Sequence, residues 1–145
     1  FHFDEDGQGQ VRLNFGPLGW GLLLAHQRAA AAIVSGGAGL ILDEVLVVPG
    51  LLDTWLKALA GHDVWMIGLH CDLAELERRE RGRGDRRAGQ AAGQFGKVHA
   101  GIRYDLELDS TRSAPEDIAT QIAHFIEASH GPQAFAVMKE MRAAH

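Results

Sequence analysis

The sequence of 145 residues lacks the features that would place it in several specialised classes of protein. Cys71 is the only cysteine, so the chain cannot form an internal disulfide. No stretch approaches the roughly 18 consecutive apolar residues of a transmembrane helix. GxSxG and HExxH patterns are absent, so a nucleophile-elbow hydrolase and a helical zinc protease have no support. An initiating methionine and a signal peptide are also missing, and we expect a processed or incomplete N-terminus.

Basic residues are in the minority. The chain has 14 Lys and Arg against 19 Asp and Glu, which gives a net charge of −5 at pH 7. This balance argues against a nucleic-acid or membrane-surface partner, and we expect a cytoplasmic protein. One stretch differs, because six of the eleven arginines lie between Arg78 and Arg87, where the local net charge is +4. Such a cluster favours a compact anionic ligand, with a solvated helix face as the alternative.

The remaining composition is that of a globular domain. Hydrophobic residues make up 46% and charged residues 23%, and the length suits one domain. Apolar periodicity and turn residues predict both helices and strands. The expected helices cover residues 17–35, 51–59, 73–83 and 115–129, and the expected strands cover 40–48, 64–70 and 104–109. Strands separated by helices imply an α/β fold with a parallel sheet covered by helices.

Local signals mark several boundaries and loops. Asp72 occupies a good N-cap position, and Ser113-Ala114-Pro115-Glu116 has the sequence of a capping box with proline in the first turn. Residues 1–16 are predicted to form an acidic, glycine-rich loop with a short extended piece at 10–15. Residues 84–101 have no strong hydrophobic face and are predicted to be a mobile excursion.

An acidic pair is the first candidate for chemistry. Asp43 and Glu44 follow the apolar run 40–42. Ligands of parallel sheets bind beyond the carboxyl ends of the strands, and an apolar strand that ends in acid is the Walker-B arrangement for Mg²⁺. A carboxylate is the ligand type that this hard cation prefers. Asp43 is therefore a candidate metal ligand, and an acidic pair that faces solvent is the alternative.

Two further segments carry candidate residues. Arg83-Gly84-Asp85-Arg86 ends the third expected helix, and arginine presents planar, permanently charged donors that match phosphate geometry. In phosphoryl transfer, a lid of this kind excludes water and neutralises charge on the transferred group. Asp109-Ser110-Thr111 follows the last expected strand, where nucleoside-binding sheets hold the base. Ordinary turn chemistry is the alternative for this second segment.

Several of these sequences occur in an order that resembles one protein family. The ordered segments are Leu40–Val45, Trp65–Asp72, Arg81–Arg86, Gly89–Gln94, Val98–His99 and Tyr104–Thr111. Phe3–Gly7 is similar to a segment from the substrate side of the same family. From about Phe1 to Ser129, the chain thus resembles the chloramphenicol phosphotransferase-like family. Several motifs in the right order are far more specific than any one of them.

The resemblance implies a P-loop kinase fold of the shikimate-kinase or adenylate-kinase type. It implies transfer of the γ-phosphate of ATP, with Mg²⁺, to a small-molecule hydroxyl, which in the family's namesake belongs to chloramphenicol. It also implies a domain over 1–130 with an arginine-rich lid at about 78–100, followed by a C-terminal tail at 131–145. The implied site residues are Asp43 on the metal and in catalysis, Arg83 and Arg86 on the phosphates and in catalysis, Asp109 and Thr111 on the nucleotide, and Phe3 and Asp4 at the acceptor.

The sequence departs from the family pattern at one point. The phosphate-binding sequence G-x-x-x-x-G-K-[ST] is absent, and none of Lys57, Lys97 and Lys139 follows a suitable glycine-rich loop. In the implied fold, the strand before that loop lies between the strands at 40–46 and 64–70. We therefore expect the chain to be a fragment of a longer protein. Two alternatives are that these strands pair directly, or that the chain is a non-catalytic remnant that binds an anion or a partner.

Overall fold

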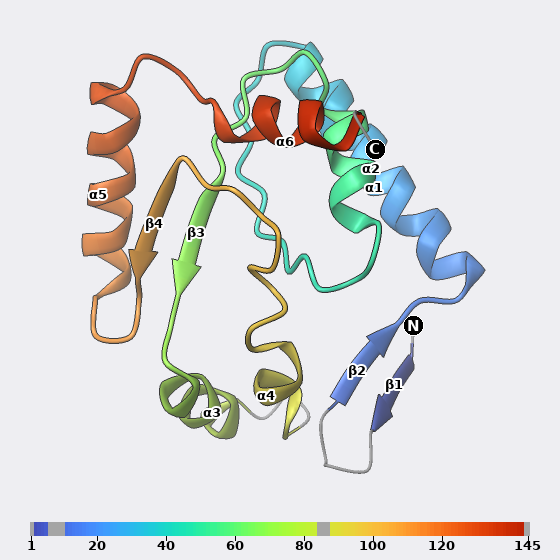
Figure 1. The fold of residues 1–145 in the computed structure, drawn as a ribbon, viewed down its shortest axis with the longest axis vertical. Helices are drawn as coiled ribbons and strands as arrows, with labels where there is room; N and C mark the ends of the chain where they lie inside the picture. Colours follow the sequence, from blue (N-terminus) through green and yellow to red (C-terminus); the bar gives the residue numbers. More distant parts are fainter. Residues whose placement is uncertain (1, 6–10, 84–87, 144–145) are drawn as a thin grey trace.

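The computed structural model describes residues 2–5, 11–83 and 88–143, in which helices and short strands alternate (Figure 1). Its elements in chain order are β1 (His2–Glu5), β2 (Val11–Asn14), α1 (Pro17–Ser35), α2 (Leu51–Ala58), β3 (Ile67–His70), α3 (Leu73–Gly82), α4 (Gln90–Gln94), β4 (Leu106–Asp109), α5 (Pro115–Ala128) and α6 (Ala134–Ala143). Among these described helices, none combines the length and the apolar character needed to cross a membrane.

The strands form two separate pairs. β1 and β2 make an antiparallel hairpin, in which Phe3 is opposite Leu13. β3 and β4 run parallel, with Gly68 opposite Glu107. In Figure 1, α5 lies alongside β4, and both parallel strands point toward α3 and α4. The α/β fold with a parallel sheet is confirmed at this coarse level, although the sheet is smaller than the sequence predicts.

The strand expected at 40–48 is absent, and that prediction is wrong. The segment has no regular secondary structure, and exposure alternates along its first half, so that Ile41 is 96% exposed while Leu42 and Leu46 pack against the core. A strand requires a partner for its backbone groups, and no described strand pairs with this segment. Direct pairing between 40–46 and 64–70 is therefore also absent from the described residues. The local apolar pattern that predicted a strand carried no information about a pairing partner.

Three smaller expectations also change. Residues 2–5 and 11–14 form the β1–β2 hairpin instead of a loop with one extended piece, and α4 gives helical structure to part of the expected excursion. The Ser113 hydroxyl donates to the Asp109 carbonyl at 3.0 Å and does not cap α5. The N-cap residue is Ala114, which makes no side-chain cap, although α5 still begins with a proline as expected. The capping-box prediction is wrong because the hydroxyl finds an acceptor in the preceding turn.

The main core lies between α1, α2 and α6. α2 buries four residues at helical spacing, and α6 contributes Phe135 and Met138, which are 6% and 2% exposed. Arg142 on α6 also forms an ion pair with Asp53 on α2. The segment that the sequence analysis set apart as a tail therefore contains a helix that packs in the same core as the first two helices. Between α1 and α2, the buried Gln27 amide donates to the Thr54 hydroxyl at 2.8 Å.

Candidate functional site

The carboxyl ends of β3 and β4 bring together the residues most suited to ligand binding. Because the two strands are parallel and in register, His70 lies opposite Asp109 where both strands end. The chain continues from β3 into the first turn of α3 and from β4 into a short turn before α5. In open α/β sheets, ligands bind at this edge.

The turn after β4 is tightly fastened to the end of β3. The Ser110 amide and hydroxyl both donate to the His70 carbonyl, at 2.8 and 3.0 Å. The Asp72 amide, which precedes α3, donates to the Thr111 hydroxyl at 3.0 Å. Thr111 in turn donates its amide to Asp109 at 2.8 Å, and its hydrogen bonds hold the pKa of that carboxyl below the usual value. The edge therefore presents an ordered turn with an ionised carboxylate.

An arginine of α3 reaches the same turn. The Arg79 guanidinium donates to the Ser110 carbonyl at 2.7 Å and to Glu75 at 2.7 Å. Glu75 also accepts two hydrogen bonds from Arg78, at 2.6 and 2.7 Å. The hydrogen bonds from Arg78 and Arg79 lower the pKa of Glu75 to about 2. Arg79 is not among the site residues predicted from the sequence, where its only signal is the four-residue spacing from Glu75 on one helix face.

A buried carboxylate joins α3 to α4. Glu80 is 8% exposed, and its two oxygens accept the backbone amides of Gly89 and Ala91 at 2.8 and 2.7 Å. Gly89 is the N-cap residue of α4 and has no side chain to cap the helix. Glu80 therefore supplies that cap from a different helix, and it fixes α4 beside the end of α3. Sequence reasoning missed this contact, because nothing local links Glu80 to α4.

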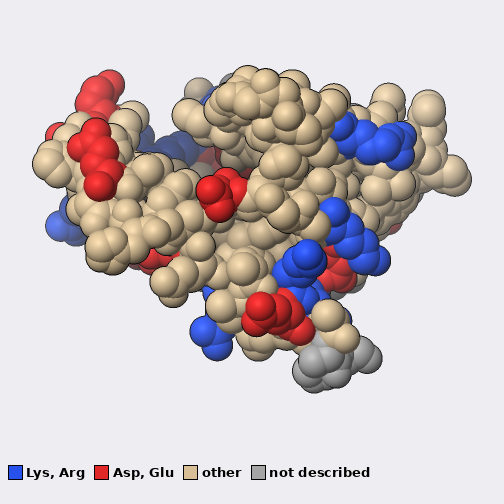
Figure 2. All heavy atoms as spheres, turned by 90° about the horizontal axis from the view of Figure 1, so that it is seen from above, with Lys and Arg blue, Asp and Glu red and all other residues tan. Residues whose placement is uncertain are grey.

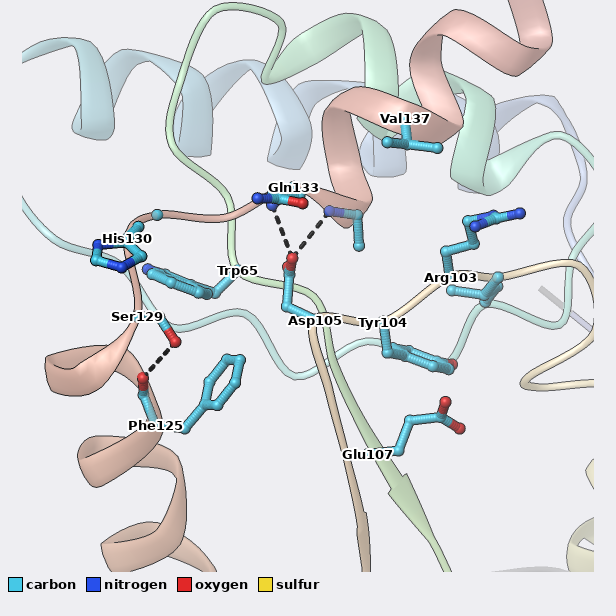
Figure 3. Close-up of a pocket in the computed structure, with 13 residues that line it drawn as sticks. Trp65, Arg103, Tyr104, Asp105, Glu107, Phe125, Ser129, His130, Gln133 and Val137 are labelled. Carbon is cyan, nitrogen blue, oxygen red and sulfur yellow. Dashed lines mark hydrogen bonds between the residues drawn. The ribbon is translucent and has the colours of Figure 1, made fainter.

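A cavity of about 650 Å³ lies elsewhere, at the amino ends of β3 and β4 (Figure 3). The Trp65 and Phe125 rings form one wall, with their centroids 5.6 Å apart. Asp105 projects from its floor, but its carboxylate already accepts the amides of Met66, Gln133 and Ala134 at 2.7 to 2.9 Å. Asp105 therefore holds the N-terminus of α6 in place. Seen from above in Figure 2, charged side chains are scattered over this end of the molecule and form no continuous basic surface on the visible face.

The sequence matches one family model, "Chloramphenicol phosphotransferase-like protein", over residues 5–127. The chain belongs to the chloramphenicol phosphotransferase-like family. Two Mycobacterium tuberculosis proteins, from strains CDC 1551 and H37Rv, are each titled "Putative O-phosphotransferase". Each is 32% identical over 132 residues, which cover 91% of this chain and 59% of the relative. The chain thus spans less than two thirds of the length of these relatives, and the resemblance found in the sequence is confirmed.

The structure places the residues implied by this family in different parts of the molecule. Asp109 and Thr111 lie together at the carboxyl edge, as described above. Arg83 is exposed at the end of α3, and within the described residues it has no side-chain hydrogen bond or ion pair. Arg86, the second arginine of the expected lid, lies outside the described residues.

The two acidic side chains after residue 42 lie in different environments. Asp43 is exposed, whereas Glu44 is half-buried, with its Oε1 3.7 Å from the His26 Nδ1. Burial raises the pKa of Glu44, while the nearby His26 lowers it in part. No hydrogen bond or ion pair of the described residues connects Asp43 to the carboxyl edge of the sheet. A metal-binding group of three or more His, Cys, Asp or Glu side chains is also absent from the described part of the chain.

The two residues implied at the acceptor lie on the hairpin. Phe3 and Asp4 belong to β1, and the Asp4 carboxylate accepts a hydrogen bond from Asn14 at 2.6 Å across the hairpin. The second strand of this hairpin contacts α4, which packs against α3. In Figure 1, the hairpin therefore lies on the same side of the molecule as the carboxyl ends of β3 and β4. For this chloramphenicol phosphotransferase-like chain, α4 is the element that connects the two regions.

Proposed function

We propose that the chain takes part in ATP- and Mg²⁺-dependent transfer of a phosphoryl group to the hydroxyl of a small molecule. The family membership supports a phosphotransferase. The observation that carries the proposal is the ordered turn Asp109–Thr111, which is fastened to the end of β3 at the carboxyl edge of a parallel sheet. In the P-loop kinase fold that the family implies, the nucleotide binds at this edge.

The proposed roles follow from the chemistry of each group. Asp109 and Thr111 bind the nucleotide, and Arg79 supports their turn through the Ser110 carbonyl. Arg83 has no counter-ion among the described residues, so its guanidinium is available for phosphate oxygens. Arg86 has the same proposed role by its place in the sequence.

Asp43 is the proposed Mg²⁺ ligand. Magnesium bound with a nucleotide often takes one or two protein carboxylates, while phosphates and water supply its other ligands. An exposed single carboxylate fits that requirement, because it does not depend on a preformed cluster of ligands. When bound, Mg²⁺ neutralises charge that develops on the phosphates.

The proposed acceptor site lies at Phe3 and Asp4, on the hairpin that contacts α4. The family name supports a hydroxyl of the kind found in chloramphenicol as the first acceptor to test. Since Asp4 already bonds Asn14, a ligand there would share or replace that hydrogen bond.

A nucleotide titration followed by NMR tests the proposal. With the 145-residue chain, ATP and Mg·ATP should shift the amide signals of residues 70–73 and 109–112. Asp109→Asn should weaken this binding severalfold, because it replaces one of the two acceptor oxygens for the hydroxyl and amino hydrogens of the nucleoside with an NH₂ donor. Asp117→Asn is the matched control, on the exposed first turn of α5. Shifts confined to the cavity beside Trp65, or equal affinities for the two variants, would contradict the proposed nucleotide site.

The runner-up function is an anion-binding domain without chemistry. The observation that favours it is that the 145 residues contain no G-x-x-x-x-G-K-[ST] sequence to hold the phosphates. The same titration separates the two functions. Inorganic phosphate alone should reproduce the shifts if the anion is the whole ligand, whereas a nucleotide site requires the adenosine and responds to Mg²⁺.

A further inference from the structure

Four polar side chains gather on one face of the β3–β4 pair, beside the proposed nucleotide edge. His70 Nε2 lies 2.7 Å from Glu107 Oε2, and His99 Nδ1 lies 2.6 Å from the Tyr104 hydroxyl. The His70 and His99 rings are stacked, with centroids 4.0 Å apart and planes tilted by 34°. These side chains come from both strands and from the segment between α4 and β4.

The backbone of β3 is shaped to receive this cluster. A Cβ atom at Gly68 would lie only 2.8 Å from the Tyr104 ring, so the ring occupies the space that a side chain would need. Tyr104 meets the His99 ring edge-on, with centroids 5.5 Å apart. The contact between His99 and His70 thus fastens residues 95–104 to the end of β3.

The hydrogen-bond partners constrain where the two rings carry their hydrogens. Glu107 can only accept, so the His70 nitrogen that faces it carries hydrogen. The Leu69 backbone lies close enough to His99 to favour its protonated form in part, although burial outweighs this effect and lowers the pKa of His99. When neutral His99 carries its hydrogen on Nε2, its Nδ1 accepts from the Tyr104 hydroxyl. A second proton on His99 would convert that nitrogen to a donor, and the Tyr104 hydroxyl would have to turn.

The surrounding charges oppose a proton on His99. Burial and the neighbouring His70 lower its pKa, while Glu107 and the Leu69 backbone raise it in part. The other charged groups near this edge are Asp109, which interacts with His70 and Arg112, and Arg79 on the turn. Two positive rings 4.0 Å apart would repel each other strongly in a partly buried site.

We propose that the stacked contact of neutral His99 with His70 holds residues 95–104 against β3, and that acid releases this segment by protonating His99. The pair acts on the nucleotide turn through the His70 carbonyl, which accepts both hydrogen bonds from Ser110. In this respect the inference rests on the proposed function. His70 and His99 are positioning residues, and acid should weaken nucleotide binding by loosening the edge.

The test is an NMR titration of the histidine rings in the ligand-free, isotopically labelled chain between pH 5 and 8.5. His70→Gln should shift the protonation midpoint of His99 upward, since it removes a like charge and keeps a hydrogen bond to Glu107. His124→Gln, at an exposed position on α5, is the control and should leave the midpoint unchanged. A His99 midpoint that does not respond to His70→Gln would overturn the proposal.

Hydrogen exchange provides a second, independent measurement. After correction for intrinsic rates, protection of the Val98, Ala100 and Ile102 amides should fall at least about tenfold between pH 7.5 and 5.5. His99→Gln cannot titrate and should abolish this pH dependence. If His99→Gln keeps the same pH dependence of amide protection, the proposed release of residues 95–104 by acid is refuted.

A third experiment measures the effect of pH on nucleotide binding. Mg·ATP is titrated into the chain at pH 7.5 and at pH 5.5, and the amide signals of residues 70–73 and 109–112 are followed. Weaker binding at pH 5.5 in the native chain, and not in His99→Gln, supports the coupling. If Mg·ATP shifts no amide at either pH, the proposed function fails. The ligand-free titration then decides by itself whether His70 and His99 control residues 95–104. If binding is equal at both pH values, the proposed function survives and the coupling is refuted.

Discussion

Removing the Glu80 carboxylate tests how α4 is held beside α3. The carboxylate is 8% exposed and accepts two backbone amides at 2.8 and 2.7 Å, so Glu80→Ala leaves both donors without this partner. A hydrogen bond to a charged group contributes about 1.5 to 3 kcal/mol net. Two effects make the total loss smaller than the sum of two such hydrogen bonds. The variant no longer buries a charge, and water can reach the freed amides. We expect a loss of about 2 to 4 kcal/mol in the free energy of unfolding.

The chain offers a matched control on the same helix. Glu77 has a side chain 41% exposed and lies 4.0 Å from Arg81, so Glu77→Ala should change stability by less than about 0.5 kcal/mol. Both substitutions place alanine in α3, and the gain in helix propensity is therefore similar in each. Glu80→Gln should fall between them, because its amide oxygen accepts one donor while its NH₂ group faces the other.

Urea denaturation monitored by circular dichroism measures the change in the free energy of unfolding of the whole chain. In a thermal melt, the expected loss lowers Tm by roughly 5 to 15 °C for a chain of this length. Hydrogen exchange at Gly89 and Ala91 measures the local effect, which detects α4 detaching without global unfolding. The reasoning is refuted if Glu80→Ala matches Glu77→Ala in stability and both amides keep their protection.

Three further predictions use the same measurements. Gly68→Ala should destabilise the chain by about 1 to 3 kcal/mol through its clash with Tyr104, while Gly82→Ala, which has open space, should not. Glu75 has a folded pKa of about 2, so its contribution to stability is present above its unfolded pKa of 4.5 and is lost as pH falls toward 2. The urea midpoint of Glu75→Gln should therefore fall less steeply than that of the native chain between pH 5 and 2.5. Asp105→Ala removes the acceptor of three backbone amides and should cost about 2 to 4 kcal/mol, with α6 exchanging fastest; an unchanged urea midpoint would show that α6 needs no such anchor.

The elements that sequence reasoning found are those fixed by local patterns. α2 buries Leu51, Leu52, Trp55 and Leu56 because their spacing makes one apolar face, and this face is visible in the sequence. The segment 40–48 shows the limit of the method. Its apolar residues predicted a strand, but a strand depends on hydrogen bonds to a neighbour that no local pattern identifies.

The candidate site divides in the same way. Asp109 and Thr111 were predictable at the carboxyl edge because Asp109 ends, and Thr111 closely follows, a strand whose direction was known. The contacts of Glu80 with Gly89 and Ala91 and of His70 with Glu107 join residues of different elements, 9, 11 and 37 positions apart. Such pairs are created by the fold, and the residues themselves carry no signal of the partner.

The charge of the α3 region shows how such a contact changes a functional argument. Counted along the sequence, Glu80 appeared as an acid that offsets part of the arginine cluster. In the structure its carboxylate points to the amides of α4 and not to any arginine among the described residues, while Glu75 serves Arg78 and Arg79 together. Among the residues that the structure describes, the positive charge of Arg83 therefore has no counter-ion, at the end of the helix that carries Glu80. A buried acid that strengthens the structure thus also preserves the positive charge that a phosphate ligand would require.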